Sequence, residues 1–109
     1  MTGRIAALTT RLLRVPLTRP WGPDVPDLGV IEVRVTADDG AVGTGFSWTP
    51  TIGATAVRAM LDDDIARFVV GRPAEPEGWD EVWRHLHEAG GGGVTTIALA
   101  GLDLSLIHI

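Results

Sequence analysis

The chain has 109 residues, 45% of them hydrophobic, and a formal net charge of −5, which predicts one globular domain with a single core. It has no lysine and no cysteine, which excludes a Schiff-base or P-loop lysine, a disulfide, a thiolate zinc site and a cysteine nucleophile within these residues. An acidic chain without a basic patch predicts no nucleic-acid partner, and no apolar run approaches the ~20 residues of a membrane span, so we expect a cytoplasmic protein.

The first half of the sequence predicts three strands. Arg4–Leu17 is rich in β-branched and aliphatic residues, and we interpret it as a long strand and not as part of an arginine-rich targeting peptide. Prolines in Thr18–Gly29 predict an irregular loop. Ile31–Thr36 alternates apolar and polar residues, as a half-buried strand does, and Asp38–Gly40 predicts a hairpin turn. The third strand, Val42–Trp48, contains two glycines that indicate close backbone packing or a bulge, and the three strands should form an antiparallel meander.

The second half of the sequence predicts helices. Apolar residues recur at helical spacing from Ala54 to Val70, and a glycine and a proline follow as stop signals. A second helix, about Glu77–Ala89, presents Trp79, Trp83 and Leu86 along one apolar stripe that we expect to be buried, with Val82 beside it. After four glycines, a third helix should run from about Val94 into Leu106 and is apolar nearly all round. The predicted fold class is therefore α+β, a three-stranded antiparallel meander followed by a bundle of about three helices.

Three clusters resemble ligand sites, and for each we favour a simpler interpretation. Glu81, His85 and Glu88 share one helix face, which suits a metal ion but also an ordinary solvated face. Asp62–Asp64 resembles a carboxylate site, but consecutive helix positions diverge by about 100°, which favours a solvated surface. Gly90–Gly93 precedes a helix, as an anion-binding loop does, but lacks the preceding strand and the lysine, so we interpret it as a connection.

Two tryptophans fall in predicted loops or at their edges. Trp21 lies in the proline-rich segment, and Trp48 ends the third strand beside Thr49-Pro50-Thr51. Because loops often carry function, both residues are candidate ligand contacts. The alternative, that each tryptophan packs its own loop onto the domain, stays open.

Four segments, in this order and at this spacing, resemble the N-terminal capping domain of the enolase superfamily, in the mandelate racemase/muconate-lactonizing enzyme group. They are Arg14–Leu17 at the end of the first strand, Val33–Phe46 across the hairpin, Val70–Pro73 after the first helix and Thr96–Leu104 in the last helix. The resemblance extends to Leu104, after which family members continue with a small residue, an apolar residue and Trp-Asp, whereas this chain ends in Ser105–Ile109.

The resemblance implies a function for the intact protein. Family members carry their chemistry on a C-terminal β/α barrel that binds Mg²⁺ through three carboxylates and removes a proton α to a carboxylate. No residue here matches those ligands or the base, so we expect residues 1–109 to be a single capping domain, truncated before the barrel, without a catalytic residue, metal ligand or cofactor of its own. The expected activity of the intact enzyme, a homo-oligomer, is acid-sugar dehydration, with racemisation or cycloisomerisation next.

In the family, two loops of the capping domain close over the barrel and help to select the substrate. By position, these loops correspond to Arg19–Gly29 and Trp48–Gly53. We expect contacts to a carboxylate-bearing small molecule from five residues: Arg19, Trp21, Trp48, Thr49 and Ile52. The arginine would meet a distal carboxylate, as in a sugar diacid. The alternative is a free-standing α+β binding or interaction module that has no barrel and no catalytic activity.

Overall fold

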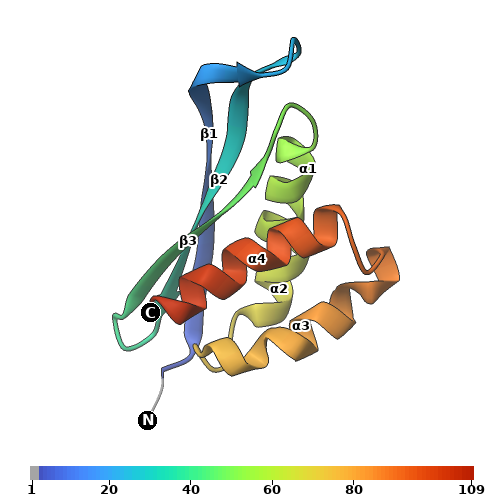
Figure 1. Cartoon of the computed structure of the whole chain (residues 1–109). Helices are drawn as coiled ribbons and strands as arrows, with labels where there is room; N and C mark the ends of the chain where they lie inside the picture. Colours follow the sequence, from blue (N-terminus) through green and yellow to red (C-terminus); the bar gives the residue numbers. More distant parts are fainter. Residues whose placement is uncertain (1–2) are drawn as a thin grey trace.

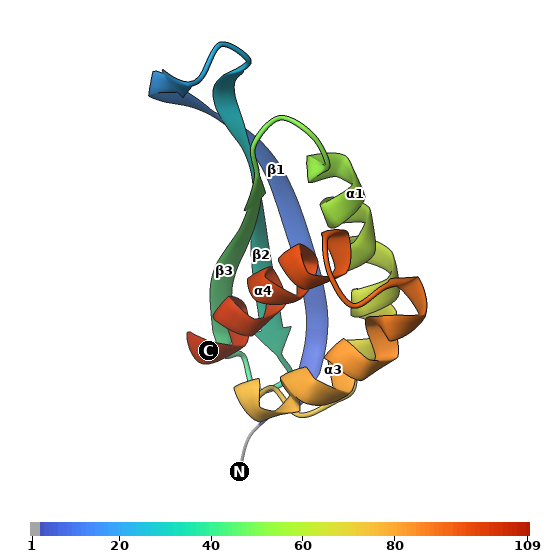
Figure 2. The same ribbon diagram turned by 45° about the vertical axis from the view of Figure 1, so that its right-hand side comes forward.

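A computed structural model describes residues 3–109 as a three-stranded antiparallel sheet with all of its helices on one face (Figures 1 and 2). The strands follow chain order across the sheet: β1 (Ile5–Trp21), β2 (Val25–Ala37) and β3 (Val42–Thr49). The predicted α+β class and the meander are confirmed. The Asp38–Gly40 turn also forms as predicted, with Gly40 at a positive φ of 91°.

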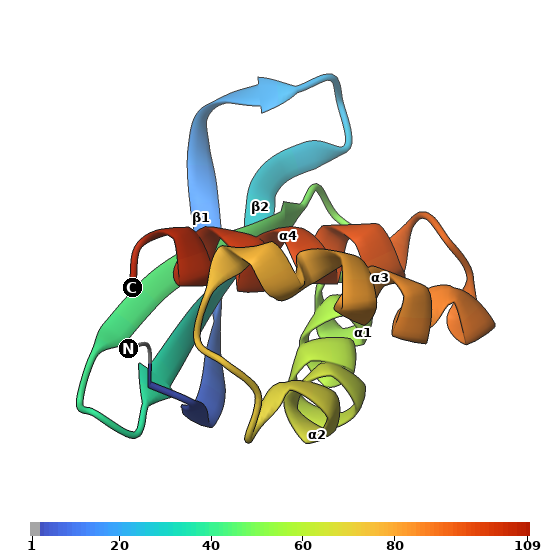
Figure 3. The ribbon, with the colours of Figure 1, turned by 90° about the horizontal axis from the view of Figure 1, so that it is seen from below.

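The helical layer consists of three segments, as the sequence predicts. The first is continuous from α1 (Ala54–Ala59) through a π-helical stretch (Met60–Ile65) to α2 (Ala66–Val69). The second is α3 (Trp79–Leu86), flanked by the 3₁₀ turns Pro76–Gly78 and His87–Ala89, and the last is α4 (Val94–Ile107). Figure 3 shows α4 lying across the sheet with α3 beside it. None of the helices described in residues 3–109 has both the length and the hydropathy that crossing a bilayer requires.

The β1–β2 hairpin is longer than the sequence predicts. The predicted irregular loop, Thr18–Gly29, is instead mostly strand, because β1 continues to Trp21 and β2 begins at Val25. Prolines are tolerated here because β1 is an edge strand and β2 pairs with β3 only from Gly29 onward, so the missing N–H groups break no central ladder. Residues 15–28, the hairpin arm, therefore project beyond the third strand (Figure 1).

The core lies between the inner face of the sheet and the helices. The alternation predicted for β2 is confirmed, since its even-numbered residues from Glu32 to Thr36 point away from the helices. The core side chains with 0% exposure come from both layers: Ile31, Val33, Val35, Val57, Leu61, Ile65, Ala98 and Leu102. Burial of such aliphatic side chains is the main term that holds the helices against the sheet.

The glycines of β3 let α4 approach the strand closely, as the sequence suggests. A Cβ atom at Gly45 would lie 2.5 Å from the backbone nitrogen of Ser105, and one at Gly43 would overlap its carbonyl oxygen. The hydroxyl of Ser47 donates a hydrogen bond to the carbonyl oxygen of Ile97 at 2.5 Å. The close approach of α4 leaves its outer edge beside the outward residues of β3.

The predicted buried stripe of α3 is wrong for its two tryptophans. Leu86 is buried, as is Val82 beside the stripe, but Trp79 is 45% exposed and Trp83 is half-buried. The reason is that the helix packs through its narrow Val82/Leu86 edge, which leaves the tryptophans on the flank. There Trp79, Trp83 and His87 form a row, with ring centroids 6.3 and 4.4 Å apart.

Candidate functional site

Trp21 and Trp48 lie against each other, although they come from strands at opposite edges of the sheet. Their ring centroids are 5.7 Å apart and the ring planes cross at 76°, an edge-to-face arrangement. The bend in β1 between Pro16 and Trp21, where the register with β2 shifts, accompanies this approach. Trp21 is 52% exposed and Trp48 42% exposed, so the pair keeps a large apolar surface open to solvent.

The other three predicted contact residues lie in different environments. Arg19 is exposed and precedes Trp21 by two positions on β1, within the segment where the register with β2 shifts. Ile52 lies in the loop between β3 and α1 and is 87% exposed. Thr49 differs, because it ends β3 on the inner face and is only 3% exposed. Its Oγ1 is buried without a hydrogen-bond partner among the described residues.

The charge distribution singles out Arg19. Six arginines form ion pairs, and the guanidinium of Arg4 donates to the carbonyl oxygen of Gly71. Within residues 3–109, the side chains of Arg19 and Arg34 make neither an ion pair nor a hydrogen bond. Arg34 lies on β2, whereas Arg19 lies near the tip of the arm. Arg19 is thus an unpaired cation two residues from an exposed tryptophan, which suits an anion that also has an apolar face.

An apolar groove of about 430 Å³ lies between β3 and α4, next to the tryptophan pair. Its lining combines outward side chains of the strand with the outer edge of the helix: Phe46, Ser47, Trp48, Pro50, Ile97, Ala100 and Leu104. The sequence analysis did not identify this groove, although the outward positions of β3 signalled its strand side. Phe46, at 51% exposure, and Trp48 extend the groove towards the arm.

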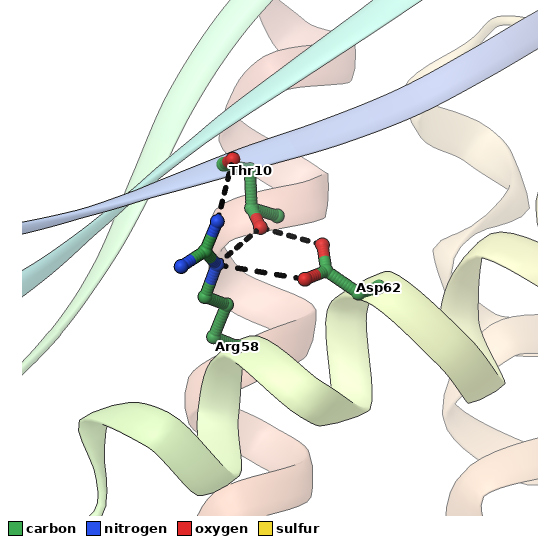
Figure 4. A network of polar contacts seen from close by, with 3 residues as sticks. All are labelled: Thr10, Arg58 and Asp62. Atoms are coloured by element: carbon green, nitrogen blue, oxygen red, sulfur yellow. Dashed lines mark hydrogen bonds and ion pairs between the residues drawn. The ribbon is translucent and has the colours of Figure 1, made fainter.

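The aspartates Asp62–Asp64 pair with side chains of the domain itself. Figure 4 shows Asp62 accepting a hydrogen bond from the Thr10 hydroxyl at 2.5 Å and facing the Arg58 guanidinium at 3.5 Å. Arg58 in turn donates to the hydroxyl of Thr10 at 3.1 Å and to its backbone oxygen at 3.4 Å, which ties strand β1 to the first helix. Asp63 and Asp64 both pair with Arg67.

The other two clusters also have structural partners. Glu81 pairs with Arg72 at 2.6 Å, and the ring of His85 stacks on that of Phe68 at 4.0 Å. The hydroxyl of Thr95 donates to the carbonyl oxygens of two of the four glycines before α4, at 2.6 and 2.9 Å. Within residues 3–109, no three His, Asp or Glu side chains are arranged to hold a metal ion.

Comparison with known proteins identifies relatives of this fold. No family model matches the sequence. The 3,6-anhydro-alpha-L-galactonate cycloisomerase of Streptomyces coelicolor (strain ATCC BAA-471 / A3(2) / M145) is 35% identical over 108 aligned residues. The match covers 94% of this chain and 30% of that protein. The crystal structure of a racemase from Streptomyces coelicolor A3(2) with bound magnesium superposes with a TM-score of 0.85 at 34% identity, again over 94% of this chain and 30% of that one.

A second structure has the same fold. A member of the enolase superfamily from Agrobacterium tumefaciens has a TM-score of 0.82 at 27% identity, covering 97% of this chain and 34% of that one. The resemblance inferred from the sequence is therefore confirmed: the chain is related to the enolase superfamily and has the fold of an enolase-like N-terminal domain. It spans about a third of the length of these relatives. The magnesium of the racemase structure has no matching ligand set in the described part of this chain.

Proposed function

We propose that this chain is the substrate-selecting cap of a Mg²⁺-dependent enolase-superfamily enzyme that removes a proton α to a carboxylate. The observation that carries the proposal is the 35% identity to a cycloisomerase, which involves 94% of this chain but only 30% of the relative. The reacting groups and the metal ligands then belong to a C-terminal β/α barrel outside these residues. The chain alone is inactive in this proposal, because residues 3–109 offer no group of three His, Asp or Glu side chains that could hold the metal ion.

The intact enzyme is proposed to act on a sugar acid. The cycloisomerase relative favours cycloisomerisation, in which the acid rearranges within one molecule. Dehydration, the activity first expected from the sequence, is the second candidate. The likeness to L-talarate dehydratase from Polaromonas sp. JS666, at 22% identity and a TM-score of 0.73, supports the shared fold only.

Within the cap, each side chain has a role that follows from its position. Trp21, Trp48 and Ile52 present apolar surface, which covers a bound acid and excludes water from the reaction. Arg19 supplies a positive charge for a carboxylate or another anionic group of the substrate. Thr49 ends β3 on the inner face and is buried, so it adds no exposed surface to this site.

The β3–α4 groove is the surface on which we place the barrel. It is apolar, and side chains of β3 and α4 line it together. Packing a second domain there would cover Phe46 and Leu104, which are otherwise in contact with water. A homo-oligomeric intact enzyme and a cytoplasmic location stay predictions from the sequence.

A chimera tests the proposal. This chain replaces the segment of the Streptomyces coelicolor cycloisomerase with which it aligns, and turnover of 3,6-anhydro-alpha-L-galactonate is measured with and without Mg²⁺. A working cap retains Mg²⁺-dependent turnover within about 10²-fold of the parent enzyme, the loss expected for a slightly misplaced lid. The chain alone and the remaining part of the relative alone serve as inactive controls.

A folded chimera that binds Mg²⁺ but turns over no sugar acid would overturn the cap function. A free-standing binding module, the alternative, predicts this result. Melting of the chimera, compared with that of the parent enzyme, shows whether the joined protein is folded.

A further inference from the structure

The hairpin arm has little support of its own. None of its residues, 15–28, is buried, and beyond Gly29 only two strands remain to pair with each other. A two-stranded hairpin is marginally stable in water unless it packs against another element. The position of the arm therefore depends on its contacts with the body of the domain.

Within residues 3–109, one side-chain contact links the tip of the arm to the body. Of the hydrogen bonds, ion pairs and ring contacts within residues 3–109, the Trp21–Trp48 contact is the one that joins residues 19–24 to an element outside the hairpin. Nearer the base of the arm, the N–H of Gly29 donates to the carbonyl oxygen of Pro50 at 3.3 Å. The arm thus contacts the end of β3 through the two tryptophans, and Gly29, at its base, is hydrogen-bonded to Pro50 in the β3–α1 loop.

We infer that Trp21 is a positioning residue that holds Trp48 and the β3–α1 loop, so that the arm and the loop move as one lid and not as two. Edge-to-face packing orients both rings, because the hydrogen-bearing edge of one ring meets the electron-rich face of the other. Removal of either ring frees the other segment. That the coupled segments act as a lid rests on the proposed cap function. The coupling itself is tested without measuring catalysis.

A second tryptophan pair provides the matched control. Trp79 and Trp83 lie four residues apart on α3 with centroids 6.3 Å apart, so their contact joins no separate segments. Trp79→Phe and Trp83→Phe together leave Trp21 and Trp48 as the fluorescent reporters. The experiments use the 109-residue chain in this background.

The test combines fluorescence quenching with amide hydrogen exchange. Trp21→Ala should raise the acrylamide quenching of Trp48 and accelerate exchange in both residues 19–25 and residues 49–53, by about 2- to 10-fold, as expected for loss of one aromatic pair. The melting temperature should change little, because neither ring belongs to the core. Trp21→Phe keeps the edge contact and should restore both readouts, and Ile52→Ala should change neither.

The opposite result is equally clear. If Trp21→Ala accelerates exchange only in the arm and leaves the quenching of Trp48 and the exchange of residues 49–53 unchanged, the two segments are independent and the inference is wrong. Should Trp21→Ala fail to fold, Trp48→Ala with Trp21 as the reporter tests the same coupling from the other side. An inactive chimera with coupled loops would reject the cap function and leave the coupling intact.

Discussion

The strands β1 and β2 run through both the body of the domain and the hairpin arm, but different forces stabilise the two regions. In the body, β2 lies between two neighbours and under the helices, and Ile31, Val33 and Val35 are fully buried. In the arm, no residue is buried and the tip contacts the body through one pair of rings. Substitutions in the body should therefore change stability, whereas substitutions in the arm should change recognition.

The largest effect should follow from Leu61→Ala in the body. Leu61 has 0% exposure beneath the sheet, and its truncation leaves a cavity that should lower the free energy of unfolding by about 2–5 kcal/mol. Leu17→Ala in the arm is the control and should cost less than about 1 kcal/mol, because the side chain is only half-buried. Urea unfolding of both variants measures the difference. Equal losses would contradict the contrast between arm and body.

Gly45→Ala tests the close contact of β3 with α4. The added methyl group would meet the Ser105 backbone at 2.5 Å, and moving the helix should cost about 1–3 kcal/mol. Gly78→Ala adds the same group where no atom lies within 4 Å, and its stability should change by less than about 0.5 kcal/mol. Thermal melting compares the two; a neutral Gly45→Ala would show that the helix shifts freely.

Trp48→Ala in the chimera should affect catalysis more than folding. Loss of the exposed ring should lower kcat/KM by an amount equivalent to about 1–3 kcal/mol, with little change in Tm. Trp83→Ala on α3 should lower Tm and leave kcat/KM largely unchanged, because Trp83 is half-buried away from the arm. Steady-state kinetics and thermal melting of both variants measure these two effects. The site is misplaced if the two variants show the reverse pattern.

The isolated chain should self-associate through the β3–α4 groove. Phe46 and Leu104 give this groove an open apolar surface that needs a partner. Sedimentation at micromolar concentration should show oligomers, and Phe46→Ser with Leu104→Ser should reduce both association and ANS binding. Trp79→Ser, on the exposed flank of α3, is the control and should change neither association nor ANS binding. A stable monomer without bound ANS would argue against an unpartnered groove.

The smallest effect should come from Arg19→Met in the chimera. Removing a solvent-exposed charge should lower kcat/KM for an acid substrate only a few-fold, roughly the effect of one exposed ion pair. Added salt should reduce the difference from the unsubstituted chimera. Arg34→Met removes the other unpaired guanidinium, away from the arm, and should have no effect. Identical kinetics for both variants would remove Arg19 from the proposed site.

Much of the fold follows from local sequence. The alternation of Ile31–Thr36 selects which face of β2 is buried, and Asp38–Gly40 forms a turn that needs a positive φ. The apolar spacing of the helices and their stop signals depend on residues only a few positions apart. These features were predictable because each depends on interactions between neighbours in the chain.

The tertiary structure alone decided the features that depend on distant neighbours. The prolines near Trp21 predict a loop, but β1 is an edge strand. The N–H groups that proline lacks are therefore not needed for pairing inside the sheet, and β1 continues to Trp21. Trp79 belongs to an apolar stripe and is exposed, because helix packing uses only one edge of that stripe. Thr49 adjoins Trp48 in sequence and points into the core, since strand alternation sends successive side chains to opposite faces. The meeting of Trp21 and Trp48 depends on how the arm bends over the sheet, and no local pattern encodes that bend.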